Sequence, residues 1–130
     1  MTNMKLRIKR WETVCSDEQH LYFASISNTD KIVFTVTDTT YNYEFTFDGH
    51  CPYMVFDEAL RSEHTVSDIA VGATFIYEDS DFLGLFNPGT MDVLFACKRV
   101  THFAIYTDDA ALEVLSDKEP SIRKYLQAIP

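Results

Sequence analysis

The stretch KIVFTVTDTTYNYEFTFDG, residues 31–49, contains two runs in which apolar and polar residues alternate. Alternation with a period of two is typical of strands that bury one face, and the polar centre at Asp38 and Thr39 predicts a tight turn. The stretch therefore predicts a β-hairpin in which Thr37 pairs with Thr40. This register places Val36 opposite Tyr41, Phe34 opposite Tyr43 and Ile32 opposite Phe45. A slip of one residue would turn all these side chains away from the core, so we expect the hairpin to be the central pair of an antiparallel sheet.

The other face of the hairpin, from Thr35 to Asp48, carries hydroxyls, an amide and carboxylates but no cation. Its acidic members are Glu44 and Asp48. Exposed carboxylates attract basic groups and repel phosphates. We therefore expect this face to present part of an acidic surface that contacts a partner.

Two further strands are expected before the hairpin. Over 5–13 the sequence alternates Leu6 and Ile8 with basic residues, and a row of like charges is typical of an edge strand because it discourages pairing between molecules. Trp11 interrupts the polar face and is expected to cap the core or to anchor a contact. The second strand is expected over 20–27, and the polar residues that follow it predict a turn.

The pattern changes after the hairpin. Large apolar residues recur at intervals of three and four after Pro52, so 52–62 is expected to be a short helix, with an edge strand as the alternative. Further strands are expected over 73–77, 82–86, 91–97, 101–107 and 111–115, with a turn at 87–89.

A helix is expected at the C-terminus, capped by Ser116 or Asp117. Its apolar stripe is formed by Ile122, Tyr125, Leu126 and Ile129. The sequence as a whole predicts a mainly β (α+β) protein in a single domain, residues 1–130. The expected architecture is a curved antiparallel sheet or an open barrel of about 7–9 strands with the C-terminal helix, and with one short central helix if 52–62 is helical.

The net charge of −9 is unevenly distributed. Residues 1–10 carry four basic side chains and no acid, residues 11–97 carry fifteen acids against Lys31 and Arg61, and residues 98–130 are balanced. An acidic body repels nucleic acid and attracts basic proteins, so no direct contact with nucleic acid is expected. No apolar run approaches the roughly 20 residues that span a bilayer, so we expect a cytoplasmic protein without a membrane partner.

The sequence contains no catalytic, metal or cofactor motif that stands out. Its three cysteines are odd in number and share no C-x-x-C spacing, which favours reduced, partly buried thiols. The best local cluster of ligand types is Asp48 with His50 and Cys51, which we interpret as a turn with an exposed imidazole. We therefore expect a protein that is not an enzyme and that holds no cofactor and no metal.

Two functions fit this sequence. The first is an acidic binding protein that docks and neutralises a basic protein, such as a nuclease or a nucleic-acid-binding protein, in the manner of an immunity protein or inhibitor. Its expected partner-binding residues are Glu44, Asp48, Asp57, Glu58, Tyr77, Glu78, Asp79, Asp81 and Phe82. The alternative is a β-barrel or cupped sheet that binds a small ligand in an aromatic pocket, with hydroxyls from Tyr41, Tyr43 and Tyr106.

Overall fold

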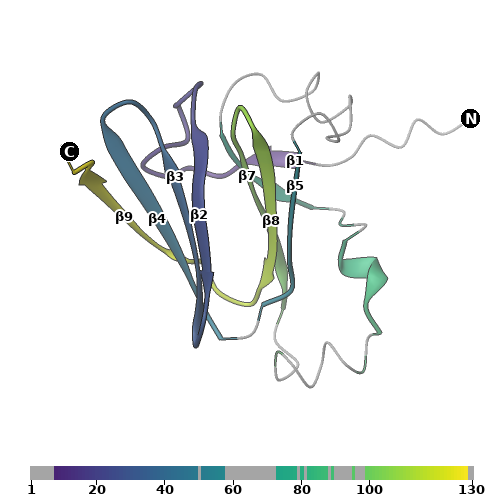
Figure 1. The fold of residues 1–130 in the computed structure, drawn as a ribbon. Coiled ribbons are helices and arrows are strands. Elements are labelled where there is room, and N and C mark those ends of the chain that lie inside the picture. Colours follow the sequence, from purple (N-terminus) through teal and green to yellow (C-terminus); the bar gives the residue numbers. More distant parts are fainter. Residues whose placement is uncertain are drawn as a thin grey trace, which may run out of the picture.

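A computed structural model describes residues 8–49, 51–57, 73–78, 80, 82–87, 89, 95 and 99–128 of the chain. These residues form nine strands in two antiparallel sheets (Figure 1). The five-stranded sheet has the order β1-β6-β7-β8-β5, and the four-stranded sheet has the order β2-β3-β4-β9. The strands are β1 (Ile8–Arg10), β2 (Tyr22–Asn28), β3 (Lys31–Thr37), β4 (Tyr41–Asp48), β5 (Tyr53–Asp57), β6 (Thr74–Tyr77), β7 (Thr101–Tyr106), β8 (Ala110–Ser116) and β9 (Ser121–Leu126).

The two sheets pack face to face through a layer of aromatic side chains. The ring of Trp11 lies 4.8 Å from that of Phe103 in the five-stranded sheet and 5.9 Å from that of Phe45 in the four-stranded sheet, measured between centroids. A third ring, Phe47, also reaches Phe103, at 5.8 Å. The prediction of a mainly β, antiparallel fold is confirmed, but the sheets form two packed layers and not a closed barrel.

The hairpin is present as β3 and β4, in the centre of the four-stranded sheet. Its register differs by two residues from the predicted one, since Val36 pairs with Tyr43 and Thr37 pairs with Asn42. A shift of two residues keeps every side chain on its predicted face, so the core is unchanged. The connection is longer than predicted because the carboxylate of Asp38 accepts hydrogen bonds from the backbone N–H groups of Thr40 and Tyr41 and so closes a wider turn.

The strands before the hairpin agree with the sequence. β1 is an edge strand of the five-stranded sheet, as its row of cations predicts. Trp11 is 5% exposed and belongs to the core, and β2 pairs with β3 as the edge strand of the other sheet. Ile8 packs on the outer face of the five-stranded sheet, against Phe75 and Tyr106.

The predicted C-terminal helix is wrong, because Ser121–Leu126 forms strand β9, paired with β4. The apolar stripe assigned to a helix is divided in the strand. Ile122 packs against the core cluster, whereas Tyr125 lies on the other face, beside Glu44. Pairing with β9 gives the second side of β4 its hydrogen-bond partners, and this tertiary gain outweighs a short segment's helical pattern.

Three other predicted elements also differ. Tyr53–Asp57 is strand β5, so the favoured helix over 52–62 is wrong and the alternative, an edge strand, is correct up to residue 57, beyond which the prediction lies outside the described residues. Leu83–Leu85 is a 3-10 turn and not a strand, because the Ser80 hydroxyl accepts the Leu83 N–H and Gly84 gives the segment little strand preference. Within 91–97 the structure describes Phe95 alone, which is helical. The strands predicted over 73–77, 101–107 and 111–115 are confirmed.

Candidate functional site

Loops from several parts of the chain meet at one end of the sandwich, the upper end in Figure 1. The N–H of Asp108 donates to the carbonyl of Leu21 at 2.7 Å, which joins the β7–β8 turn to the start of β2. The N–H of Gln127 donates to the carbonyl of Thr40 at 3.0 Å, which joins the end of β9 to the β3–β4 turn. Hydrogen bonds between backbones make this end a continuous surface.

This end, which we call the acidic end, is rich in carboxylates. In the described part of the chain they face two permanent cations, Arg10 and Lys124, and one histidine, His20. Among the described residues the opposite end is more balanced, because its five carboxylates stand with Lys9, Lys31, Arg99 and Lys118. The carboxylates of the acidic end are Glu12, Asp17, Glu18, Asp38, Asp57, Asp108 and Asp109. Within the described part of the chain, the larger excess of negative charge therefore lies at the acidic end.

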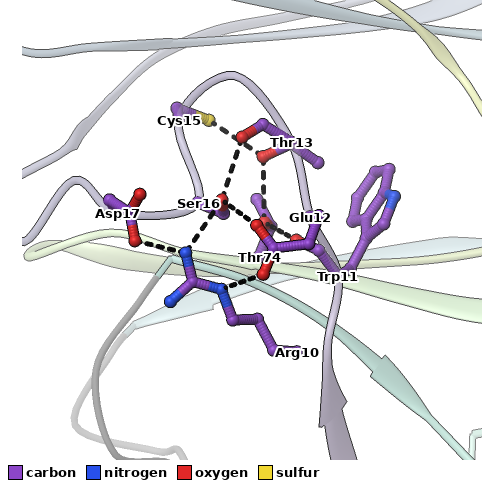
Figure 2. Close-up of polar contacts among 8 residues, drawn as sticks. All are labelled: Arg10, Trp11, Glu12, Thr13, Cys15, Ser16, Asp17 and Thr74. Carbon is purple, nitrogen blue, oxygen red and sulfur yellow. Dashed lines mark hydrogen bonds and ion pairs between the residues drawn. The ribbon is translucent and has the colours of Figure 1, made fainter.

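The loop after β1 is fixed by side chains rather than by ladder pairing (Figure 2). Arg10 reaches the carboxylates of Glu12, at 2.7 Å, and of Asp17. On the inner side the hydroxyl of Thr74 donates to the carbonyl of Trp11 at 2.6 Å. The backbone of the loop is therefore fixed by these contacts. The side chains of Glu12 and Asp17 nevertheless remain 77% and 88% exposed to solvent.

Asp38 is the most constrained carboxylate of the acidic end. It accepts hydrogen bonds from two backbone N–H groups of its turn, both at 2.6 Å, and from the hydroxyl of Tyr43 at 2.8 Å. Burial acts to raise the pKa of Asp38, but these hydrogen bonds and the charge of Lys124 outweigh it, so the pKa of Asp38 is lowered. Burial, with the adjacent carboxylate, raises the pKa of Tyr43. Asp38 therefore stays charged and Tyr43 stays a neutral donor at neutral pH.

A surface hollow of about 500 Å³ opens between the loop 17–20 and the β3–β4 turn. Its lining includes Asp17, Glu18 and Asp38, with the rings of Tyr41 and Tyr43. The ammonium group of Lys124 lies 4.1 Å from the ring centre of Tyr41, a cation–π contact within the hollow. The hollow thus already holds one cation of the protein against aromatic and acidic groups.

The partner-binding residues predicted from the sequence do not gather in one place. Asp57 lies at the acidic end, since it pairs with Ala110 at the β7–β8 turn. Asp48 lies at the opposite end, paired with Lys31. Glu44 lies on the outer face of the four-stranded sheet and accepts a hydrogen bond from the hydroxyl of Tyr125 at 3.3 Å. Glu78 follows β6 and is exposed, and Glu58, Asp79 and Asp81 lie outside the described residues.

Tyr77 and Phe82 are predicted as exposed anchors beside the acidic loop, and the structure places them differently. Phe82 is 6% exposed and packs against Phe86. The ring of Tyr77 stacks on that of His102, with centroids 4.3 Å apart. Both rings are therefore engaged with the outer face of the five-stranded sheet.

The sequence interpretation missed most of the acidic end. Asp17, Glu18, Asp108 and Asp109 lie between segments that the sequence predicts to be strands, and none of them is among the predicted partner-binding residues. Each segment carries the polar composition of a loop, but their meeting depends on how the two sheets are placed against each other. The alternation of residues along a strand does not contain that information.

Metal and thiol chemistry gain no support from the described residues. No group of three or more His, Cys, Asp or Glu side chains among them is arranged to hold a metal ion, and His50 lies outside them. Cys15 and Cys51 are free and buried, as predicted, whereas Cys97 lies outside the described residues. Burial raises the pKa of Cys15 to about 11 and also raises that of Cys51, so neither is an activated thiol.

Comparison with protein-family models, with curated proteins and with solved structures finds no match to this chain. In the part of the chain that the structure describes, no helix has both the length and the apolar character needed to cross a membrane. The function is therefore inferred from the geometry of the acidic end.

Proposed function

We propose that this chain is an acidic binding protein whose acidic end docks onto a basic protein and neutralises it. The observation that carries the proposal is the convergence of seven carboxylates, from segments far apart in sequence, on one end of the sandwich. A focused patch of one sign attracts an oppositely charged partner and orients it during encounter. The partner expected is a nuclease or another nucleic-acid-binding protein, whose basic surface would be covered.

The arrangement of the acidic end also suits rapid recognition. Its backbone is held by hydrogen bonds between loops, so little conformational entropy is lost when a partner binds. Asp17, whose side chain is 88% exposed, stands at the edge of the hollow lined by Tyr41, where a basic side chain of the partner can meet both negative charge and an aromatic ring. Charge then governs the association rate and the ring contact contributes to residence time.

The alternative of a ligand pocket inside the protein receives no support from the described residues. Tyr43 is completely buried in the core, and Tyr106 lies on the outer face of the five-stranded sheet among Phe75 and Ala111. Tyr41 and Tyr43 meet at the surface hollow of the acidic end, on the opposite side of the molecule's core from Tyr106, so the three hydroxyls do not line one interior pocket. The aromatic side chains between the sheets pack on one another.

The test compares two charge-reversed variants of equal net charge. Asp17→Lys with Asp108→Lys alters the acidic end, and Asp48→Lys with Glu119→Lys alters the opposite end. Tagged wild type and both variants are used to capture proteins from the source organism's lysate at low salt, and the captured protein is identified by mass spectrometry. We expect a basic protein to bind the wild type and the Asp48/Glu119 variant but not the Asp17/Asp108 variant.

The mechanism is then tested with the purified partner. Its association rate is measured between about 0.05 M and 0.5 M salt, and we expect a fall of roughly tenfold or more. An association rate that does not change with salt contradicts electrostatic docking. Equal binding by the two variants contradicts the assignment of the acidic end, provided that both unfold at the temperature of the wild type.

A further inference from the structure

A buried pair of ionisable side chains lies on the outer face of the five-stranded sheet and does not belong to the acidic end. The Nε2 atom of His102 on β7 lies 2.6 Å from Oε1 of Glu113 on β8. The two residues are only 4% and 7% exposed. Burying such a pair costs desolvation energy that an apolar pair would not, so its presence calls for an explanation.

Ser80 extends this pair to the surface. Its Oγ atom lies 2.6 Å from Nδ1 of His102 and also accepts a hydrogen bond from the backbone N–H of Leu83 at 2.9 Å. Ser80 accepts the Leu83 N–H through one lone pair and still has its hydroxyl proton to donate to Nδ1 of His102. In the tautomer that accepts this proton, Nε2 carries the imidazole hydrogen and faces the carboxylate of Glu113.

The three side chains therefore stand in the order hydroxyl, imidazole and carboxylate. The hydroxyl belongs to a half-buried residue, whereas the imidazole and the carboxylate are buried. This is the order in which a serine nucleophile is activated by a general base that a carboxylate orients. The serine faces Nδ1 here and the carboxylate faces Nε2, and either nitrogen of an imidazole can accept the proton.

Two aromatic rings hold the imidazole in place. Tyr77 stacks on His102 with an angle of 16° between the planes, and Phe82 meets the ring edge-on at a centroid distance of 5.6 Å. Tyr77 also lines a surface hollow of about 600 Å³ together with Glu78 and Thr101, the chain neighbours of Tyr77 and His102, although Ser80 itself is not part of its lining. The imidazole is therefore fixed in orientation, which general-base catalysis requires.

We propose that Ser80 is a nucleophile toward acyl groups of small carboxylic esters, with His102 as general base and Glu113 as a positioning residue. Ser80 Oγ forms a bond to the carbonyl carbon while its proton passes to Nδ1 of His102. The bond between that carbon and the alcohol oxygen breaks, and the leaving alkoxide takes the proton from His102. Water, deprotonated by the same imidazole, then attacks the acyl-serine, and the products are a carboxylic acid and the free hydroxyl of Ser80.

The test uses a fluorophosphonate probe, whose phosphorus bonds to an activated serine with loss of fluoride. The intact protein is incubated with the probe, and the modified serines are located by peptide mass spectrometry. We expect Ser80 to react at least about a hundredfold faster than Ser27, an exposed serine on β2 that serves as an internal control. Ser80→Ala removes this labelling and leaves that of Ser27 unchanged.

Two variants of Glu113 test whether its carboxylate supports the activation of Ser80 through His102, which we call a relay, or only stabilises the fold. Glu113→Gln keeps the size but loses the charge, and Glu113→Asp keeps the charge but is shorter. A relay predicts faster labelling of Ser80 in the Asp variant than in the Gln variant, whereas a structural role predicts labelling that follows thermal stability. If neither variant folds, the release of p-nitrophenol from p-nitrophenyl acetate is compared between wild type and Ser80→Ala, because water removes the acetyl group from Ser80 in the proposed reaction. Faster release by the wild type supports the proposal. Labelling of Ser80 no faster than of Ser27, or equal release by the two proteins, overturns it.

Discussion

The two sheets of this protein bury their strands in different ways. In the four-stranded sheet β3 alternates between buried and partly exposed residues along its length, and only one face meets the core. In the five-stranded sheet every residue of β8, Ala110–Ser116, is buried. Both faces of β8 are covered, one by the other sheet and one by the cluster that contains Phe82 and Phe95.

This difference determines in which layer polar side chains can be buried. The layer between the sheets holds apolar and aromatic side chains, so that side is a packing layer. The outer layer of the five-stranded sheet holds His102 and Glu113 among aromatic rings, where both side chains are shielded from water. The matching face of the four-stranded sheet leaves Glu44 partly exposed. A glutamate on the outer face of the five-stranded sheet is therefore buried, whereas a glutamate on the outer face of the four-stranded sheet stays partly exposed.

The largest loss of stability is expected from a substitution in the core layer between the two sheets. Phe45→Ala removes a completely buried ring that contacts Trp11, and we expect it to lower the free energy of unfolding by about 3–5 kcal/mol. Urea unfolding, followed by the fluorescence of the single tryptophan, measures this loss. Thr35→Ala, on the outer face of the same sheet, serves as the control and is expected to change stability by less than about 0.5 kcal/mol. Equal losses in the two variants would contradict the one-sided burial of this sheet.

The next largest loss of stability is expected at a glutamate of the five-stranded sheet, and a glutamate of the four-stranded sheet serves for comparison. Glu113→Leu leaves His102 without its buried carboxylate partner, and we expect a loss of about 3 kcal/mol in the free energy of unfolding. Glu44→Leu removes a partly exposed carboxylate 3.8 Å from Arg123, and we expect a loss below about 1 kcal/mol. Thermal unfolding monitored by circular dichroism compares the two.

A double variant sharpens this comparison. His102→Leu with Glu113→Leu removes both partners, so no ionisable group of the pair remains unmatched in the outer layer. We expect the double variant to be more stable than Glu113→Leu alone, since most of the cost of the single change comes from the group left behind. A double variant that is no more stable than Glu113→Leu would show that the two side chains do not act as a pair.

The central hairpin was the most predictable part of the molecule from sequence. Strict alternation from Lys31 to Asp48 assigned each side chain of the hairpin to its face, and this assignment survives a two-residue error in register. The errors concern segments whose state depends on a neighbour. Ser121–Leu126 forms a strand because it pairs with the free edge of β4. The local sequence of 121–126 carries no information about that pairing.

The candidate site was less predictable than the fold. The sequence showed an acidic body, but Glu44 and Asp48 were chosen because they lie on the outer face of the hairpin, and Glu78 because it adjoins the acids Asp79 and Asp81. The structure groups carboxylates by the ends of the sandwich instead, and that grouping follows from the packing of one sheet on the other. The alignment of Ser80 with His102 likewise requires a loop to fold back over β7.

A smaller effect is expected at the turn that joins β3 and β4. Asp38→Asn weakens the acceptor for two backbone N–H groups and for the hydroxyl of Tyr43, and we expect a loss of about 1 kcal/mol at pH 7. The pKa of Asp38 is lowered in the folded protein, so its stabilising contribution is present above the pKa of the unfolded chain and is lost as pH falls through the folded pKa.

The difference in stability between wild type and Asp38→Asn should therefore shrink as the solution is acidified below the usual aspartate range, about pH 4. Urea unfolding at a series of pH values measures this difference. Asp30→Asn, in the β2–β3 turn, is the matched control, because Asp30 accepts only a hydrogen bond from the hydroxyl of Thr29 among the contacts described. A difference for Asp38→Asn that stays constant down to the lowest pH would show that the charge of the carboxylate contributes nothing.

The smallest effect concerns Lys124, which links β9 to the same turn. Lys124→Met keeps the aliphatic stem in the strand but removes the cation that lies over Tyr41, and we expect a loss of about 0.5–1 kcal/mol. The charge of Lys124 is also one of the causes that lower the pKa of Asp38, so its removal should move the acid-dependent loss of stability to higher pH. The same pH series, repeated on Lys124→Met and on the double variant with Asp38→Asn, measures the coupling. In the double variant this shift disappears, because the shift requires the carboxylate; a shift that persists would place its origin in another acid of the acidic end.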